Sequence, residues 1–368
     1  MGDLYDVLDA LSDTNGQKLL ATIIRVEGSA YRKEGTMMLL TEDHKRVGLL
    51  SGGCLDDDLA ERAPLVWEEG VSRTVVYDLS AEDDLSWGQG HGCNGILHVL
   101  MEPLDGEQTE HLHNLRRQLN DGISLLHIKR LSEEWTVTDY LFYSENNQWF
   151  GKWSGAIPQH LDRLFANRKA GLKGLKESCQ PTERFFIQFF EPKPRLIIFG
   201  AGPDAKPLVS FAARAGFHVV VTDWRPALCN HIHFPEANER VIGLPDTIAA
   251  DFPFSRRDSV IVMTHHFQKD QQIIHALISK KLQYFGILGS RERTARLLGG
   301  AIPSWLHSPV GLPIGAEGPE EIAISILGDV IKADRLRRGE DKNDLGNISG
   351  GRPEQENGQI QIVSACRS

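Results

Sequence analysis

The chain has 368 residues, of which 41% are hydrophobic and 24% are charged, and its formal net charge is −10. This length exceeds what one hydrophobic core usually organises, so we expect two or three domains. The acidic balance argues against binding to nucleic acid or to an anionic membrane surface, since both require clustered positive charge. The sequence has no signal-peptide pattern and no apolar run long enough to span a membrane. We therefore expect a cytoplasmic protein.

The five cysteines are scattered and form no CxxC pair, which argues against a zinc ribbon and against a disulfide framework. The first half mixes helical and strand patterns, as in an α+β domain. Apolar spacing predicts helices over 3–12, 54–69 and around 112–119, and Pro64 is expected to kink or end the second of them. Strands are predicted over 18–26, 37–41, 46–50, 73–79, 96–101, 123–130, 135–143 and 184–191.

The second half changes to alternating strands and helices after Pro192-Lys193-Pro194, which we expect to be a domain boundary. Strands are predicted over 196–199, 218–222, 259–263 and 284–288, and helices over 203–215, 268–281, 290–299 and 319–335. The predicted fold class is therefore α/β, with a C-terminal Rossmann-type parallel sheet and an N-terminal α+β domain. The expected parts are an N-terminal domain at 1–104, connecting strands and helices at 105–192 that complete this half, a Rossmann-type domain at 193–337, and a mobile polar tail at 338–368.

A glycine-rich loop, GAGPDA at 200–205, joins the first of these strands to its helix. Gly200 would allow the tight turn, and Gly202 would let backbone amides approach a phosphate. Asp223 ends the next strand, where a carboxylate can accept a hydrogen bond from a ribose hydroxyl. Asp204, however, places negative charge where a pyrophosphate would lie. Three interpretations stay open: NAD redox chemistry, another nucleotide or phosphorylated pterin, and a loop that only packs.

The segment Ser51-Gly52-Gly53-Cys54 precedes a predicted helix. A thiol at a helix N-terminus is favoured as thiolate, and so becomes a better ligand for a soft metal or for sulfur. The three acids at 56–58 oppose this effect by repelling negative charge. Cys93 lies in a second glycine-rich loop together with His91, and the two loops could form one site if they meet. The alternative is that each cysteine is a small buried apolar residue.

Further candidate residues lie in the first long loop and at two strand ends. Arg32 could pair with a phosphate or a carboxylate, or it could be a solvated loop arginine. His265 and His266 end a predicted core strand, at the sheet edge where open α/β sheets bind ligands, and the alternative is a structural hydrogen bond. Ser290 could cap the following helix, and Arg291 could reach an anion.

Taken in order, several segments resemble the xanthine dehydrogenase accessory protein family, also called the XdhC/CoxI family. The resemblance spans nearly the whole chain except mainly 105–182 and the tail. The matching segments are ATIIRVEGSAYRKEG at 21–35, SGGC at 51–54, GCNG at 92–95, LIIFGAGPDA at 196–205, THH at 264–266, GILGSRERTARL at 286–297 and PIGAEGPEEIAISILGDVI at 313–331.

The resemblance implies a non-catalytic maturation factor. Such a protein binds molybdenum cofactor (molybdopterin), protects it, favours its sulfurated form and delivers it to a xanthine dehydrogenase-like apoenzyme, with a cysteine desulfurase as a further partner. Cys54 is then the residue that contacts the cofactor and its molybdenum, and the loop at 200–205 would suit a pterin phosphate or the nucleotide of a dinucleotide form. The sequence departs from the family pattern at Asn94, at His266 and at Pro203-Asp204, so the ligand of the second half is less defined than Cys54.

We therefore expect a cleft between the two halves, with Cys54 on one wall and Gly200–Gly202 on the other. Two alternatives stay open. One is an NAD(P)-dependent oxidoreductase, suggested by the glycine loop and Asp223, although no Ser-Tyr-Lys set or other proton-transfer constellation is visible. The other is an accessory subunit that remains in a xanthine dehydrogenase complex. A homodimer, the molybdoenzyme served and the form of the cofactor are not determined by the sequence.

Overall fold

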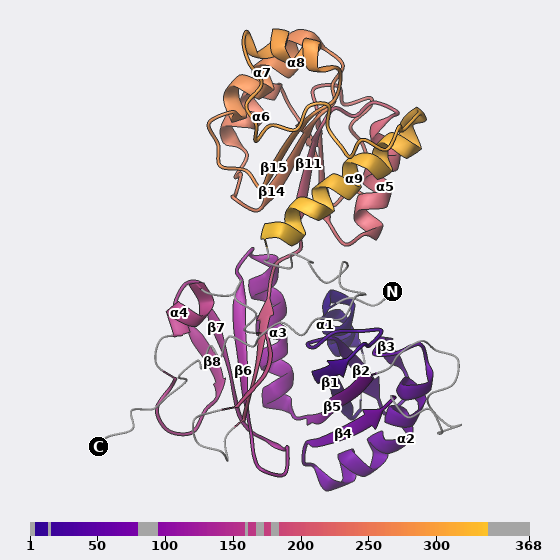
Figure 1. Ribbon diagram of the computed structural model, residues 1–368, viewed down its shortest axis with the longest axis vertical. Helices are drawn as coiled ribbons and strands as arrows, with labels where there is room; N and C mark the ends of the chain where they lie inside the picture. The colour runs from indigo at the N-terminus through magenta and orange to yellow at the C-terminus, as the bar shows by residue number, and fades with distance from the viewer. Residues whose placement is uncertain are drawn as a thin grey trace, which may run out of the picture. The chain divides into compact units, whose positions relative to one another are not determined.

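The computed structural model describes residues 4–13, 16–79, 95–158, 161–166, 173–177 and 184–337, apart from the side chains of Asp13, Cys54 and Glu177. These residues form two compact units that divide the chain between Pro192 and Lys193 (Figure 1). Unit 1 precedes this division and unit 2 follows it, and each is described by itself. The tail expected at 338–368 lies outside the described residues.

Unit 1 contains two antiparallel sheets of the same size. Sheet A has the strand order β3-β2-β1-β5-β4, and sheet B has the order β8-β7-β6-β10-β9. The strands of sheet A are β1 (Lys18–Gly28), β2 (Met37–Thr41), β3 (Arg46–Gly48), β4 (Arg73–Asp78) and β5 (Gly95–Leu104). The strands of sheet B are β6 (Leu125–Leu131), β7 (Val137–Ser144), β8 (Trp149–Lys152), β9 (Gly174–Glu177) and β10 (Arg184–Phe190).

Helices cover these sheets because each sheet has apolar side chains on both faces. One core contains apolar residues of α1, of α3 and of strands from both sheets. A second core joins α2 to the other face of sheet A, and a third joins α4 to sheet B (Figure 1). The helices of unit 1 are α1 (Leu4–Asp13), α2 (Cys54–Glu69), α3 (Gly106–Asn120) and α4 (Leu161–Ala166).

Helix α2 continues through Pro64 to Glu69, so of the two effects expected of this proline, a kink or an end of the helix, the end is wrong. Pro64 is exposed, whereas Leu59, Ala63 and Val66 are buried against sheet A. An interior proline costs a helix about 3 kcal/mol, and burying one large aliphatic side chain gains about 1.5–3 kcal/mol. The buried face of α2 therefore outweighs the proline.

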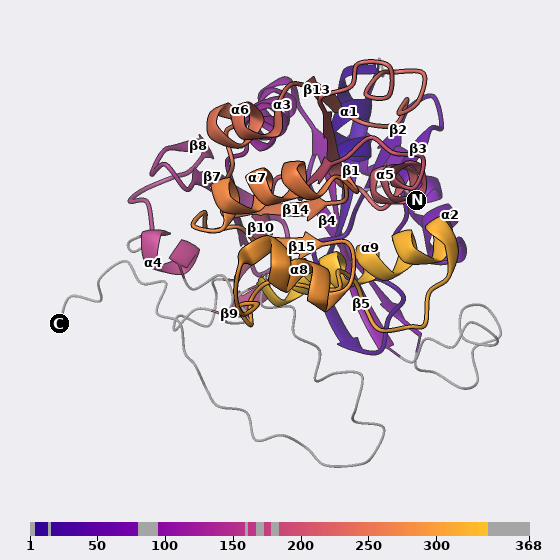
Figure 2. The same ribbon diagram turned by 90° about the horizontal axis from the view of Figure 1, so that it is seen from above.

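Unit 2 is a five-stranded parallel sheet with the order β13-β12-β11-β14-β15. Helices cover both faces: α5 and α9 share one core with the sheet, and α6, α7 and α8 share the other (Figures 1 and 2). The strands are β11 (Arg195–Phe199), β12 (His218–Asp223), β13 (Glu239–Ile242), β14 (Asp258–Val262) and β15 (Tyr284–Ile287). The helices are α5 (Ala205–Arg214), α6 (Pro245–Asp251), α7 (Phe267–Leu277), α8 (Arg291–Leu298) and α9 (Gly318–Arg337).

This architecture confirms the predicted fold class, a Rossmann-type parallel sheet after an α+β half. The elements that the sequence did not predict are short or lie at sheet edges: β8, β9, β13, α4 and α6. No helix within the described ranges is long and apolar enough to cross a membrane.

Candidate functional site

One end of sheet A gathers the loops that carry the sequence-predicted residues of unit 1. The last residue of β1 pairs with Gly95, the first residue of β5. The amide of Leu79, just after β4, donates to the carbonyl oxygen of Gly95 over 3.0 Å. Leu79 and Gly95, which flank residues 80–94, therefore both lie at this end, which we call the loop end of sheet A. Cys93 and His91 belong to that segment and lie outside the described residues.

The start of α2 lies at the same corner of the sheet. Asp58 follows Cys54 by about one helical turn, a spacing that makes the two positions neighbours along α2. The hydroxyl of Tyr77 on β4 donates to Asp58 Oδ2 over 2.5 Å. Tyr77 pairs with Leu97, two residues after Gly95. The first turn of α2 and the anchors of segment 80–94 are therefore neighbours.

The turn before α2 requires glycine. Gly53 has φ 132° and ψ −48°, a backbone conformation that side-chain-bearing residues rarely adopt. A Cβ added there would meet no atom within 4 Å among the described residues, so the space beside Gly53 is open, and Gly52 is exposed. Ser51 Oγ accepts the Gly53 amide over 3.0 Å, and Gly53, as the N-cap residue, has no side chain that could cap α2. The N-terminus of a helix favours a negatively charged group.

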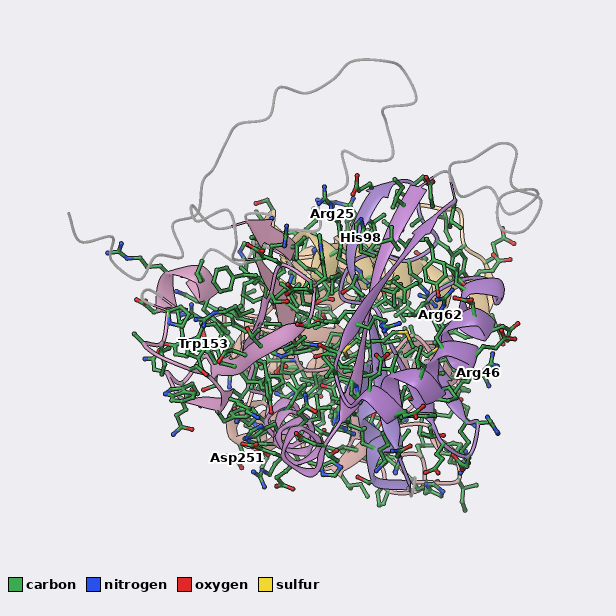
Figure 3. All side chains as sticks on the ribbon, turned by 90° about the horizontal axis from the view of Figure 1, so that it is seen from below. Arg25, Arg46, Arg62, His98, Trp153 and Asp251 are labelled. Atoms are coloured by element: carbon green, nitrogen blue, oxygen red, sulfur yellow. The ribbon has the colours of Figure 1, made fainter. Side chains whose placement is uncertain are left out.

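Two of the three aspartates in the first turns of α2 form ion pairs with arginines. Arg46 of β3 pairs with Asp57, and Arg62 pairs with Asp58 over 2.6 Å. Figure 3 shows Arg46 and Arg62 beside the ribbon of α2. Partial burial raises the pKa of Asp58. Hydrogen bonds from Arg62 and Tyr77 lower this pKa by more than burial raises it, so the pKa lies below its ordinary value. Nearby positive charge therefore compensates both carboxylates.

The third aspartate, Asp56, is buried instead of paired. Its Oδ1 accepts the Leu50 amide over 3.2 Å, and its Oδ2 has no hydrogen-bond partner among the described residues. Burial raises the pKa of Asp56 above its ordinary value. The repulsion expected between the three acids and a thiolate at Cys54 is consequently smaller than their number suggests, because two are neutralised and the third is less readily ionised.

Arg32 lies in the loop between β1 and β2, at the loop end of sheet A. Its guanidinium carbon is 5.3 Å from the ring centroid of Tyr31. Its Nε is buried and has no hydrogen-bond partner in the described part of the chain. The loop is held in place where the amide of Gly35 donates to the Ile23 carbonyl oxygen over 2.7 Å. A half-buried cation with an unused donor therefore belongs to the same end of the sheet as Cys54.

In unit 2 the glycines of the predicted phosphate loop have other neighbours. Gly200 has φ 123°, and a Cβ there would lie 2.5 Å from the carbonyl oxygen of Met263, so glycine lets β11 and β14 approach each other. A Cβ on Gly202 would lie 2.5 Å from Oδ1 of Asp204. The space above Gly202, which the sequence assigns to a phosphate, therefore contains a carboxylate oxygen.

The carboxylate of Asp223 is fully engaged within unit 2. Oδ2 accepts the Ala201 amide over 2.8 Å, and Oδ1 accepts the Arg225 amide over 2.9 Å. The guanidinium of Arg225 donates to both oxygens over 2.9 Å. Burial raises the pKa of Asp223, but these hydrogen bonds outweigh burial, so the pKa is lowered. Asp223 therefore stabilises the glycine loop, and the Ala201 amide of this loop donates to Asp223 instead of to a ligand.

The two histidines after β14 have separate environments. His265 Nε2 lies 2.6 Å from Asp204 Oδ2, and its φ of 59° places it in the left-handed region. This conformation is uncommon in residues other than glycine, although histidine is among those that adopt it more often. His266 caps α7 by accepting the Lys269 amide over 3.4 Å, and its ring lies edge-on to Trp224. The structure therefore brings His265, but not His266, to the glycine loop.

At the next strand end, Ser290 caps α8 by accepting the Arg293 amide over 3.2 Å, which confirms the predicted cap. Arg291 donates to the Ser308 carbonyl oxygen over 3.0 Å. Cys229 is a buried free thiol in the core of unit 2, as the alternative interpretation of the cysteines expected. No group of three or more metal-ligating side chains occurs within the described ranges.

The sequence analysis missed a set of buried polar side chains on β5 of sheet A and β6 of sheet B. Lys129 and Glu102 form an ion pair in which both side chains are only 5% exposed. The ring of His127 is stacked on Phe142, and neither ring nitrogen has a hydrogen-bond partner among the described residues. Burial, with a smaller contribution from Lys129, holds the pKa of His127 well below its ordinary value. Only the alternation of polar and apolar residues in β6 could have indicated this set.

Comparisons with known proteins match most of the chain in three segments. Residues 12–78 match the XdhC and CoxI family, residues 106–191 match the family described as BH1974-like, central domain, and residues 196–330 match the XdhC Rossmann domain. The second match covers residues 106–191, the region whose structure and relatives the sequence patterns defined least.

Individual relatives cover nearly the full length. A probable xanthine dehydrogenase subunit of Bacillus subtilis (strain 168) is 44% identical over 90% of this chain and 98% of its own. The crystal structure of a xanthine dehydrogenase from Bacillus halodurans is 48% identical, covers 93% of this chain and 98% of its own, and superposes with a TM-score of 0.82.

A more distant relative is "Molybdenum cofactor insertion chaperone PaoD" of Escherichia coli (strain K12), 24% identical over 91% of this chain and 88% of its own. These matches confirm the resemblance that the motifs indicated. The chain belongs to the XdhC and CoxI family.

Proposed function

We propose that this protein is a chaperone that binds molybdenum cofactor and delivers it to a xanthine dehydrogenase-like molybdoenzyme. The observation that carries the proposal is the grouping at the loop end of sheet A, where Cys54 starts α2 beside the anchors of the segment that contains Cys93. The printed name of the E. coli relative, a molybdenum cofactor insertion chaperone, supports it. The name of the B. subtilis relative supports xanthine dehydrogenase as the type of enzyme served.

The residues at this end suit a sulfur-ligated, anionic cargo. A cysteine at an uncapped helix start is favoured as thiolate, and thiolate is a ligand that soft metal centres accept. Arg46 and Arg62 neutralise the acids that would oppose the thiolate. Arg32 is a half-buried cation whose exposed part can pair with a phosphate of the cargo. Binding through one thiolate and hydrogen bonds remains reversible, as delivery requires.

The finer parts of the proposal follow from this chemistry. A thiolate ligand would protect the molybdenum centre, and the proposed cargo is the sulfurated form, supplied with sulfur by a cysteine desulfurase. A free thiol at position 54 needs a reducing compartment, so the proposal places the protein in the cytoplasm. A dinucleotide form of the cargo and a homodimer of the chaperone are compatible with the proposal and are not required by it.

A nicotinamide oxidoreductase receives no support from the glycine loop. The carboxylate that would bind a ribose hydroxyl, Asp223, already accepts hydrogen bonds from Ala201 and Arg225. The position of the pyrophosphate is next to the carboxylate of Asp204. Both features disfavour the dinucleotide that such an enzyme needs.

The test is cofactor retention by purified protein. The wild-type chain, Cys54→Ala and Cys229→Ala are loaded with molybdopterin cofactor under reducing, oxygen-free conditions and separated from free cofactor. Molybdenum content and the fluorescence of the oxidised pterin are then measured. Loss of the thiolate ligand should weaken retention at least tenfold, which corresponds to about 1.4 kcal/mol. Cys229→Ala removes a thiol from the core of unit 2 and should retain cofactor as the wild type does.

A transfer assay separates a chaperone from a permanent subunit. Loaded protein is mixed with a cofactor-free xanthine dehydrogenase, and the activated enzyme is purified. A chaperone should raise enzyme activity and be absent from the purified enzyme, whereas a subunit would remain in fixed stoichiometry. Equal retention by Cys54→Ala and the wild type would remove Cys54 from the site and with it this proposal.

A further inference from the structure

Unit 2 contains an apolar pocket at the carboxyl end of its sheet, which we call the α5–α9 pocket. It has a volume of about 250 Å³ and lies between the start of α5, the ends of β14 and β15 and the first turns of α9. Its wall is made by the side chains of Leu208, Met263, Leu288, Ile322, Ala323 and Ile326. Asp204 and His265 are the only ionisable residues that line it, among the described residues.

The pocket lies at the point where the strand order of the sheet reverses. β11 has β12 on one side and β14 on the other, so the loops after β11 and β14 flank the crevice in which open α/β sheets bind ligands. Asp204 follows β11, His265 follows β14, and their 2.6 Å contact spans this crevice. His265 keeps its left-handed backbone there, and its side chain is 62% exposed. Backbone strain of this kind is concentrated at functional sites.

The charge at this crevice disfavours a diphosphate. Asp204 fills the space above Gly202, and the Ala201 amide is committed to Asp223. A phosphate oxygen next to the Asp204 carboxylate would be repelled by it. The favourable partner of this carboxylate is a group with N–H donors and no negative charge.

We propose that the α5–α9 pocket binds a flat, uncharged heterocycle that presents two adjacent N–H donors beside a carbonyl. This is the edge of a 2-amino-4-oxo ring, as in a pterin or a guanine. The apolar wall suits the ring faces, and a carboxylate accepts two adjacent donors in the same way as it accepts a guanidinium. Asp204 is the acceptor of these donors, which replace His265 Nε2 at Asp204 Oδ2, and the released imidazole N–H of His265 is a donor to the ring carbonyl. The inference rests on the proposed function in that the organic part of molybdenum cofactor is a pterin.

The test measures the affinity of the full-length chain for two matched pairs of probes by calorimetry or ligand fluorescence. Guanosine is compared with inosine, and 6-hydroxymethylpterin with 6-hydroxymethyllumazine, because the second member of each pair lacks the 2-amino group. In at least one pair, the probe with the 2-amino group should bind at least tenfold more tightly than the probe without it. Preference for the pterin over guanosine identifies a pterin as the occupant, and the reverse preference identifies a guanine nucleoside.

Three variants locate the binding. Asp204→Asn should lower affinity for the amino-bearing probe at least tenfold, since it keeps the shape of the side chain and loses one acceptor. Asp246→Asn, an exposed acid on α6, should leave affinity unchanged. Ala323→Leu should abolish binding by filling the pocket, and Ile322→Phe provides a second filling variant at a less buried position. Circular dichroism and thermal unfolding check that each variant is folded.

Several results would overturn the inference. These are equal affinities within both probe pairs, unchanged affinity in Asp204→Asn, or competition of ADP-ribose with the heterocycle in the wild type. Cys54→Ala separates this inference from the proposed function, because a free pterin without dithiolene or molybdenum gives Cys54 no ligand to bind. That variant should bind the heterocycle normally. Unchanged cofactor retention in Cys54→Ala with normal ring binding would contradict the proposed function alone, and equal affinities within both probe pairs with lost cofactor retention in Cys54→Ala would contradict this inference alone.

Discussion

Helices α2 and α5 both start after a glycine-rich turn, yet their starts have opposite electrostatic surroundings. At α2, arginines neutralise Asp57 and Asp58, and the N-cap residue is Gly53, which has no side chain. At α5, the carboxylate of Asp204 occupies the space above the second glycine, and Asp223 accepts a loop amide. A glycine turn followed by a helix therefore does not by itself define an anion site. The side chains that distant parts of the chain supply decide which group such a turn accepts.

The largest expected difference between the two turns is the effect of an alanine substitution. Gly200→Ala places a Cβ 2.5 Å from the Met263 carbonyl oxygen in a backbone with φ 123°, so steric overlap adds to backbone strain. We expect unit 2 to lose about 4 kcal/mol. Gly53→Ala has a similar φ of 132° but open space, so only strain of about 2 kcal/mol is expected in unit 1.

Chemical denaturation of the full chain, followed by peptide-resolved hydrogen exchange, assigns each loss to its unit. Gly299→Ala, at the end of α8, is a control, since its φ of 67° strains the backbone and no atom lies within 4 Å. It should lose about 1 kcal/mol, less than Gly53→Ala, because the left-handed region is allowed for residues with a Cβ. A loss for Gly200→Ala no larger than that for Gly53→Ala would contradict the close approach of β11 and β14.

Asp223→Asn should have the next largest effect, because an amide replaces a buried carboxylate that accepts four hydrogen bonds. We expect unit 2 to lose about 2 kcal/mol at pH 7. The folded state lowers the pKa of Asp223, so its stabilisation is present above the unfolded-state pKa of about 3.9 and is lost as the pH falls through the folded value.

The difference in unfolding free energy between the wild type and Asp223→Asn should therefore be constant from pH 7 to about pH 5, and shrink below about pH 4. Glu236→Gln, which removes an exposed partner of Arg214, should change stability by less than about 0.5 kcal/mol at pH 7. A difference for Asp223→Asn that grows on acidification would refute the assigned ionisation.

The features that could be predicted from the sequence are those that depend on residues close together along the chain. The strands of unit 2 are continuous apolar runs, and Ser290 precedes its helix directly, so both could be inferred from local patterns. Strand β13 has no buried residue, and α6 has only seven residues, so neither has enough apolar periodicity to be detected.

Contacts between distant loops could not be predicted in the same way. Asp204 and His265 were each noted, one as an obstacle to a phosphate and the other as a candidate ligand residue, but their contact spans 61 positions. Asp57 was expected to oppose a thiolate, and only the strand pairing that places β3 beside α2 brings Arg46 to it. Charge compensation depends on tertiary structure, and for that reason the motif around Cys54 was visible while its electrostatics were not.

The smallest expected effect tests that compensation at α2. Arg62→Gln leaves Asp58 ionised one helical turn from Cys54, and an added negative charge disfavours the thiolate. Two charges about 6 Å apart in water interact by about 0.7 kcal/mol, so the pH profile of Cys54 alkylation should move up by about half a unit. Asp58→Asn should move it down, and Arg214→Gln in unit 2 should not move it. Iodoacetamide rates, resolved by peptide mass spectrometry, measure all three. Shifts of the same sign in Arg62→Gln and Asp58→Asn would mean that these variants act on Cys54 through the shape of α2 and not through charge.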